Sequence, residues 1–312
     1  MIFKAFQMCD FVFFHGTTVR RNARGHYGVF TPSRTDPTRE PDVVMREPVN
    51  RRMHAAPSWQ ADVLNLRGQC VLSRNHEMFD YGPACEILAR MKVFIVFAHA
   101  EPRSFNGAMF RTARDTLHAA GHAVAVSDLY AMKFDPVSDR RNFTTVKNLD
   151  FFKQQIEEMH ATEAGGFAPE VETELRKMEA CDLMIWQFPL WWFGLPGILK
   201  GWADRVFAMG RTYGGERFYE NGVFKGKRAL LSLTTGGPEA VYQRGGRNGD
   251  IHAILRPIQR GILRFTGWDV LQPNIVCAPV RVSDEQRQAS LNAWAERLRG
   301  IEKERPVEVG EY

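Results

Sequence analysis

The sequence has few cysteines, and none of them forms a recognisable pair. The five cysteines of this 312-residue chain contain no CxxC motif and no spacing typical of metal ligands. This pattern argues against a disulfide-stabilised secreted domain, so we expect a cytoplasmic protein without a metal centre. Cys181 and Cys277 are expected to be small buried apolar residues.

Long apolar runs and dense positive charge are also missing. No stretch of about 18 apolar residues occurs, so we expect no membrane span. The net charge of +5 is mild and is not gathered into a stripe, which argues against a nucleic-acid partner. The chain has neither a GxGxxG fingerprint nor a Walker loop, so a Rossmann nicotinamide site is disfavoured.

Residues 1–90 lack the sustained periods that are typical of helices and strands. Four prolines interrupt residues 31–49, and Lys4 is the only lysine in a segment rich in arginine. We therefore predict a mostly disordered N-terminal extension over 1–90, and we hypothesise that the native protein starts at Met91. An arginine-rich targeting presequence is the alternative interpretation.

From Met91 onward, strand patterns alternate with helical patterns, which predicts an α/β domain over 91–312. Helices are expected at 169–180, 196–209 and 250–264, before Gly121, and after a capping box at Ser283 and Gln286. We expect a doubly wound, five-stranded parallel sheet with right-handed crossovers. Its strands are predicted at 92–98, 122–127, 182–188, 228–234 and 270–276.

The loop after the first strand, residues 99–107, leads directly into a helix. Ser104 and Asn106 supply hydroxyl and amide donors there, and His99 and Arg103 can add positive charge. Such a helix start suits a phosphate or pyrophosphate group. A helix start that is merely well capped explains the same residues.

The loop after the third strand carries three adjacent aromatic residues, Trp191, Trp192 and Phe193. Because open α/β sheets bind ligands at the carboxyl ends of their strands, these rings are suited to form a wall for a flat ring. The alternative is that they only bury apolar area.

The loop after the fourth strand contains Thr234, Thr235, Gly236 and Gly237. Its glycines allow close approach of a ligand, and its threonines can hydrogen-bond ring heteroatoms, although a simple turn needs the same residues. Tyr242 follows and is equally compatible with a structural and a catalytic role. Together the three loops meet at the switch point of a flavodoxin-like sheet, and this convergence predicts a flavin site.

Residues 91–305 resemble the NAD(P)H:quinone oxidoreductases of the DT-diaphorase type. The resemblance implies a flavodoxin-like fold, a homodimer, and non-covalently bound FAD rather than FMN at the dimer interface. It is carried by matched blocks in the same order: Phe97-Ala98-His99, Ser104-Phe105-Asn106, residues 127–132, 187–196, 198–202, 205–207, Thr234 to Gly237, 257–259 and 261–263.

The resemblance also implies roles for individual residues. The pyrophosphate and ribityl side of FAD would contact His99, Ser104, Phe105 and Asn106. The isoalloxazine would lie against Pro189, Leu190, Trp191, Trp192 and Phe193, with Trp191 in place of a glutamine usual in the best-known members. Its polar edge would meet Thr234, Thr235, Gly236 and Gly237, and the adenine-side phosphate would meet Arg287. The partner subunit's copies of Tyr213 and Phe218 would cover the substrate beside Trp192 and Phe193.

In the family mechanism, NAD(P)H reduces the flavin by hydride transfer and leaves, and a quinone then takes the hydride from the same space. Tyr242 would donate a hydrogen bond to the pyrimidine edge of the flavin. The histidine that accompanies this tyrosine in mammalian-type members is Asn248 here, which cannot take a proton at neutral pH. We hypothesise that Arg247 or Arg244 offsets the flavin charge instead, with His252 as the weaker alternative.

Two other functions stay open for a chain of this kind. One is a flavoprotein ancillary subunit that regulates a potassium-efflux system, and the other is an azo- or nitro-compound reductase, because a stacking slot discriminates weakly among flat acceptors. A one-electron flavodoxin carrier is disfavoured, because the aromatic loop and the partner's Tyr213 would enclose a ring edge that a carrier must expose.

Overall fold

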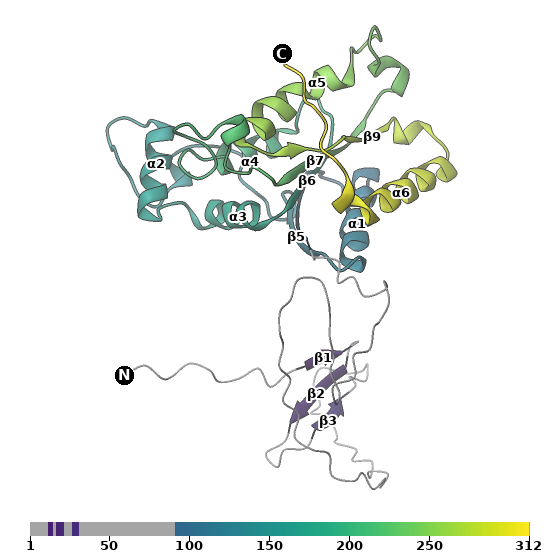
Figure 1. Ribbon diagram of the computed structural model, residues 1–312, viewed down its shortest axis with the longest axis horizontal. Coiled ribbons are helices and arrows are strands. Elements are labelled where there is room, and N and C mark those ends of the chain that lie inside the picture. The colour runs from purple at the N-terminus through teal and green to yellow at the C-terminus, as the bar shows by residue number, and fades with distance from the viewer. Residues whose placement is uncertain (1–11, 15–16, 22–26, 31–90, 312) are drawn as a thin grey trace, which may run out of the picture. The chain divides into compact units, whose positions relative to one another are not determined.

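The computed structural model describes residues 12–14, 17–21, 27–30 and 91–311 (Figure 1). The chain divides into two compact units, 1–65 and 66–312. In the first unit, β1 (Val12–Phe14), β2 (Thr17–Arg21) and β3 (Tyr27–Phe30) form an antiparallel sheet in that order, which the sequence reasoning did not predict. The rest of the disorder predicted for 1–90 lies outside the described residues.

The second unit is built on a parallel sheet, as predicted. Its order is β5-β4-β6-β7-β8, with β9 also paired to β7. The strands are β4 (Lys92–Phe97), β5 (Ala123–Asp128), β6 (Leu183–Pro189), β7 (Arg228–Thr235), β8 (Asp269–Val270) and β9 (Asn274–Cys277). The predicted fifth strand is thus two short strands, because Pro273 lies between them and has no N–H to continue the ladder.

Helices cover both faces of this sheet, which confirms the doubly wound architecture (Figure 1). On one face, α1 (Phe105–Ala119) and α6 (Asp284–Arg299) pack Leu117 and Trp294 against the apolar side of β4 and β6. The other face is covered by α3 (Pro169–Ala180), α4 (Gly197–Val206) and α5 (Ile251–Ile258). The sequence reasoning missed α2 (Gln154–Ala164), which precedes α3.

Local signals explain where the helices begin and end. Ser283 and Gln286 form the predicted capping box at the start of α6. The predicted helix over 250–264 is α5 followed by a π-helical turn (Gln259–Leu263) and a 3-10 turn (Arg264–Thr266). This change of geometry follows Pro257, which has no N–H for an intrahelical bond.

A buried arginine joins α4 to the loop that precedes α2. The guanidinium of Arg205, which is 2% exposed, donates to Asn142 Oδ1 at 2.6 Å, to the Asp135 carbonyl at 2.7 Å and to Glu170 at 2.8 Å. It also lies 5.0 Å from the ring of Phe134. Because its three nitrogens all have acceptors, this buried charge is compensated.

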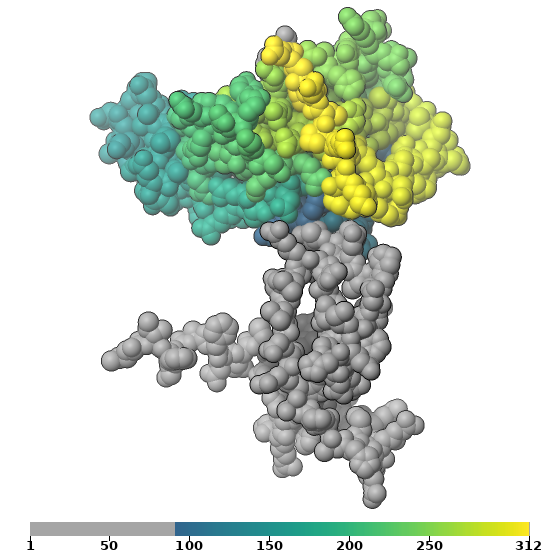
Figure 2. Space-filling model, viewed as in Figure 1, coloured from purple at the N-terminus to yellow at the C-terminus, as the bar shows by residue number. Residues whose placement is uncertain are grey.

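The C-terminal segment after α6 returns across the sheet domain (Figure 2). Val307 donates its N–H to the Val270 carbonyl at 2.8 Å, and Val309 packs against the core. Among the residues described, no helix combines the length and the apolar character that crossing a membrane requires.

Candidate functional site

Three loops are tied together at the carboxyl edge of the sheet. The Ala98 N–H donates to the Gln187 carbonyl at 3.0 Å, and the Leu190 N–H donates to the Thr234 carbonyl at 2.8 Å. These bonds join the residue after β4 to the end of β6, and the residue after β6 to the end of β7. The structure therefore brings the three sequence-predicted loops to one place, where doubly wound sheets bind ligands.

The loop before α1 is held in one conformation by local bonds. The Ser104 hydroxyl caps α1 by accepting the Gly107 N–H at 3.1 Å. A Cβ on Gly107 would lie 2.0 Å from the Pro102 carbonyl oxygen, so only glycine fits there. Backbone and side-chain hydrogen bonds from Arg103 lower the pKa of Glu101, which keeps that exposed carboxylate ionised. The free N–H groups of a helix start remain suited to an anion.

The aromatic loop holds its rings outward. Trp192 is 97% exposed, with Trp191 at 43% and Phe193 at 51%, so these rings do not bury their area within the described chain. Mutual backbone hydrogen bonds between Trp191 and Gly194 close the loop. Trp192 and Phe193 have φ angles of 49° and 59°, a left-handed conformation that is unfavourable for aromatic residues. Such strain at a ligand edge is typical of functional loops.

The imidazole of His99 lies near this loop. Its ring centroid is 6.3 Å from that of Trp191, at an interplanar angle of 56°. Nδ1 of the histidine accepts the Glu101 N–H at 3.0 Å. The first and second loops thus meet through side chains as well as through backbone.

The third loop combines hydroxyls with open space. Thr235 Oγ1 donates to the Gly237 carbonyl at 2.8 Å, whereas a Cβ on Gly236 would meet nothing within 4 Å. A Cβ on Gly237 would lie 3.2 Å from Tyr242 Cε2 and 3.6 Å from Asn248 Nδ2. Tyr242 is buried at the end of a 3-10 turn (Glu239–Tyr242). Tyr242 and Asn248 therefore both border the glycine loop.

Comparisons with known proteins agree with this geometry. Residues 91–298 match the family described as having a flavodoxin-like fold. The ribosyldihydronicotinamide dehydrogenase (quinone) of Pongo abelii is 44% identical over 221 residues, covering 70% of this chain and 96% of that protein. NAD(P)H dehydrogenase (quinone) 1 of Cavia porcellus is 43% identical over 220 residues, covering 70% of this chain and 80% of that protein.

The chain belongs to the NAD(P)H quinone oxidoreductase family. A solved structure from Klebsiella pneumoniae, described as a quinone reductase, is 39% identical, with a TM-score of 0.67 and coverage of 70% of this chain and 87% of that one. The family membership and the flavodoxin-like fold predicted from the sequence are thereby confirmed.

The other predicted site residues lie in different surroundings. The Arg287 guanidinium donates to the carbonyls of Pro279 and Val282 at 3.0 and 2.6 Å and pairs with Asp284, so its charge is partly compensated. The rings of Tyr213 and Phe218 pack on Phe265, with centroids 5.8 and 5.0 Å from it. Among the described residues, no aromatic pair joins these two rings to the loop of Trp192 within the same chain.

Tyr213 also borders a cavity of about 380 Å³ between α2, α4 and the π-helical turn. Glu158 lines this cavity, and burial raises the pKa of its carboxyl although it accepts the Met209 N–H at 2.7 Å. Burial and the neighbouring Glu158 charge raise the pKa of the Tyr213 phenol. Both pKa shifts are in the direction of the neutral form.

Gln187 is a site residue that sequence reasoning named only as the start of the aromatic stretch. Its side chain is fully buried at the end of β6 and donates to Asn106 Oδ1 at 2.7 Å. Asn106 in turn donates to Thr234 Oγ1 at 2.6 Å. An amide within an otherwise apolar buried strand was the available signal, because buried polar side chains need partners.

These residues fit a flavin. The exposed rings of Trp191 to Phe193 offer a stacking surface, the space beside Gly236 admits a ring edge, and buried hydroxyl and amide groups at the strand ends can meet its heteroatoms. The buried Gln187 Oε1 has no partner among the described residues, so this edge keeps unused hydrogen-bonding capacity.

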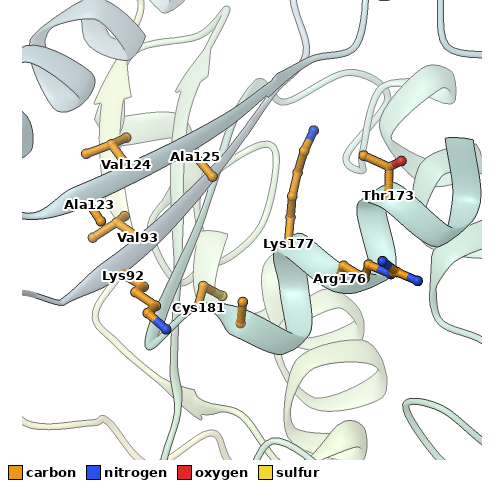
Figure 3. A pocket seen from close by; sticks show the side chains of 10 residues that line it. Lys92, Val93, Ala123, Val124, Ala125, Thr173, Arg176, Lys177 and Cys181 are labelled. Carbon is orange, nitrogen blue, oxygen red and sulfur yellow. The ribbon is translucent and has the colours of Figure 1, made fainter. Parts of the chain in front are cut away.

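A second cavity, of about 540 Å³, lies at the opposite edge of the sheet (Figure 3). It is lined by the starts of β4 and β5 and by α3, and its side chains are mainly small and apolar. Lys177 is held by Glu174 and Ser127 at 2.7 and 2.9 Å, and burial raises the pKa of the Cys181 thiol to about 12. Because burial disfavours the Cys181 thiolate and the Lys177 ammonium is already paired, neither residue offers a free reactive group in this cavity.

Proposed function

We propose that the protein catalyses the two-electron reduction of quinones by NAD(P)H with a bound flavin, FAD in preference to FMN. The observation that carries this proposal is the strained loop that exposes Trp192 and Phe193 beside the hydroxyl and glycine loop of β7. The names of the relatives, which are quinone dehydrogenases, support the same reaction. When bound, the flavin would supply the hydride-accepting and hydride-donating chemistry.

The protein's own residues would bind the flavin, orient it and polarise its ring system. The loop of His99 and Ser104 would receive the phosphate side, and the rings of Trp191 to Phe193 would stack on the ring system. Tyr242 would place a hydroxyl near the polar edge, where negative charge develops on reduction. Asn248 would offer a hydrogen bond there but no proton acceptor.

We further propose a cytoplasmic homodimer in which the partner's Tyr213 and Phe218 complete the substrate slot. The segment before and within α2 supports the dimer, because large exposed apolar side chains close in sequence are typical of an interaction surface. They are Val146, Leu149, Phe151 and Ile156, which are 46%, 82%, 62% and 48% exposed. The Leu149→Asp substitution is expected to weaken self-association in analytical ultracentrifugation.

Rapid-mixing spectroscopy tests the proposed reaction. We expect bound flavin to be bleached by NADH, NADPH or ribosyldihydronicotinamide and to recover its colour when a soluble quinone is added. Running the three donors side by side identifies the preferred one. A flavin that binds but is not bleached within minutes would contradict the enzyme and favour a regulatory flavoprotein.

A further inference from the structure

Three buried polar side chains form a hydrogen-bond chain across the sheet edge. Gln187 Nε2 donates to Asn106 Oδ1 at 2.7 Å, and Asn106 Nδ2 donates to Thr234 Oγ1 at 2.6 Å. Gln187, Asn106 and Thr234 are 0%, 3% and 6% exposed. They come from β6, the first turn of α1 and the end of β7, so the hydrogen-bond chain links all three loops of the candidate site.

The direction of this chain is set at its inner end. Gln187 Nε2 also points to the sulfur of Met109, 3.8 Å away, and a thioether can only accept a hydrogen bond. The amide nitrogen thus faces two acceptors, whereas an inverted amide would place its oxygen against the sulfur. Inversion would lose the Met109 contact, so the amide nitrogen of Gln187 faces Asn106.

The orientation of the Gln187 amide also fixes the orientation of Asn106 and of the Thr234 hydroxyl. Asn106 accepts with Oδ1, so its Nδ2 is the group that faces Thr234. The Thr234 hydroxyl accepts that bond and keeps its own hydrogen free. If the hydrogen bonds ran in the opposite direction, the Thr234 hydroxyl would donate its hydrogen to Asn106. Only the lone pairs of Thr234 Oγ1 would then face the site.

We propose that Gln187 and Asn106 are positioning residues that make the Thr234 hydroxyl a fixed hydrogen-bond donor toward an acceptor atom of the bound flavin. The inference rests on the proposed function. A preoriented donor favours the electron-rich reduced ring over the oxidised one, because it needs no reorganisation when charge develops. Gln187 and Asn106 therefore act on the flavin through Thr234.

The midpoint potential of the protein-bound flavin tests this proposal by a double-mutant cycle. Thr234→Val removes the hydroxyl at constant shape, and Asn106→Leu removes the group that orients it. We expect each substitution to lower the potential by a similar amount, on the order of tenfold in relative affinity for reduced flavin, or about 30 mV for two electrons. Thr234→Ser, which keeps the hydroxyl, should remain near the wild-type value.

The coupling distinguishes positioning from a general structural effect. In the Thr234→Val background, Asn106→Leu is expected to cause no further shift, and Gln187→Met should behave in the same way. Equal shifts in both backgrounds would overturn the proposal. Met109→Leu, a volume-conserving change, should give a smaller shift in the same direction.

Neutron diffraction of the deuterated wild-type protein tests the direction without any substitution. We expect deuterium on Gln187 Nε2 toward Asn106, on Asn106 Nδ2 toward Thr234, and a Thr234 deuteron that points away from Asn106. The reverse order would overturn the proposal even if the variants fail to fold. A wild-type protein that binds no flavin would contradict the proposed function, whereas additive potential shifts in a flavin-loaded protein would contradict only this inference.

Discussion

Tyr242 and Asn248 both border Gly237, where an added Cβ would lie 3.2 Å from the tyrosine ring and 3.6 Å from the asparagine amide nitrogen. The ring of the buried Tyr242 thus shares its surroundings with an amide instead of a titratable ring. An amide can hold a hydrogen bond but cannot store a proton released or taken up during the reaction. This pairing bears directly on how the reaction depends on pH.

Replacing Asn248 with histidine is expected to introduce a pH dependence. In Asn248→His, flavin reduction should acquire a titration near the ordinary histidine pKa of about 6.5. The reduction rate of the wild-type protein should not show this titration, since an asparagine side chain does not titrate. Single-turnover flavin reduction measured from pH 5.5 to 8.5 checks this. Matching profiles for the two proteins would contradict a role for position 248 in proton handling.

Removing the hydroxyl of Tyr242 should slow flavin reduction without unfolding the protein. Tyr242→Phe keeps the buried ring, so the midpoint of thermal unfolding should change little. The donor toward the flavin edge is lost, and one such donor is worth about tenfold or more in rate. Half-reaction rates that are unchanged in both directions would show that the hydroxyl has no part in the reaction.

The aromatic loop should contribute to flavin binding more than to folding. Trp192 is 97% exposed, so Trp192→Ala should alter the free energy of unfolding by less than about 0.5 kcal/mol. Loss of one stacking ring is expected to cost about 1 kcal/mol of flavin affinity, or about fivefold in Kd. Met132→Ala, at another exposed apolar residue, is the matched control. Equal effects of both substitutions on Kd would contradict the stacking role.

Glu158 is expected to make the protein less stable as the pH rises. Burial raises the pKa of this carboxyl, so the unfolded chain ionises first and binds fewer protons. Its contribution to stability is fully present below the unfolded pKa, about 4.3, and is lost as the pH rises toward the raised folded value. The free energy of unfolding, measured by chemical denaturation between pH 4 and 8, should decline less with pH in Glu158→Gln than in the wild-type protein. An identical slope would show that this carboxyl does not titrate differently on folding.

The buried guanidinium of Arg205 should matter far more than an exposed cation on the same helix. Arg205→Met leaves Asn142 Oδ1 and the Asp135 carbonyl without their donors, which is expected to cost about 3 kcal/mol of unfolding free energy. Lys200→Met removes an exposed pair with Asp204, worth less than about 1 kcal/mol. Urea denaturation compares them, and similar losses would contradict the structural role of the Arg205 network.

The alternating pattern after Met91 predicted the sheet, because buried parallel strands are apolar along their whole length and their number and order constrain topology. Pro273 within 270–276 divides the last strand, a detail that apolar content alone does not reveal. The helix α2 was missed because its apolar face is short and two buried glutamates, Glu157 and Glu158, occupy it. They accept backbone N–H groups outside the helix, from Lys147 in the preceding loop and from Met209 after α4, which helical periodicity does not encode.

At the site, the three loops were predictable because each follows a strand that the sequence marks clearly. The hydrogen-bond chain from Gln187 to Thr234 was not predictable, since it depends on strand register. Gln187 and Ser232 are paired, which brings Thr234 and Asn106 within reach. Register and helix placement follow from tertiary packing and not from residue spacing. The partner-subunit roles of Tyr213 and Phe218 stay predictions.

The most direct test of the account is a titration of the purified protein with FAD and FMN, followed by absorption spectroscopy during addition of NAD(P)H and then a quinone. We predict micromolar or tighter flavin binding, a shifted flavin spectrum, bleaching by the donor and full recovery on addition of the quinone. A folded protein that stays colourless and leaves both flavins free in solution would contradict the account.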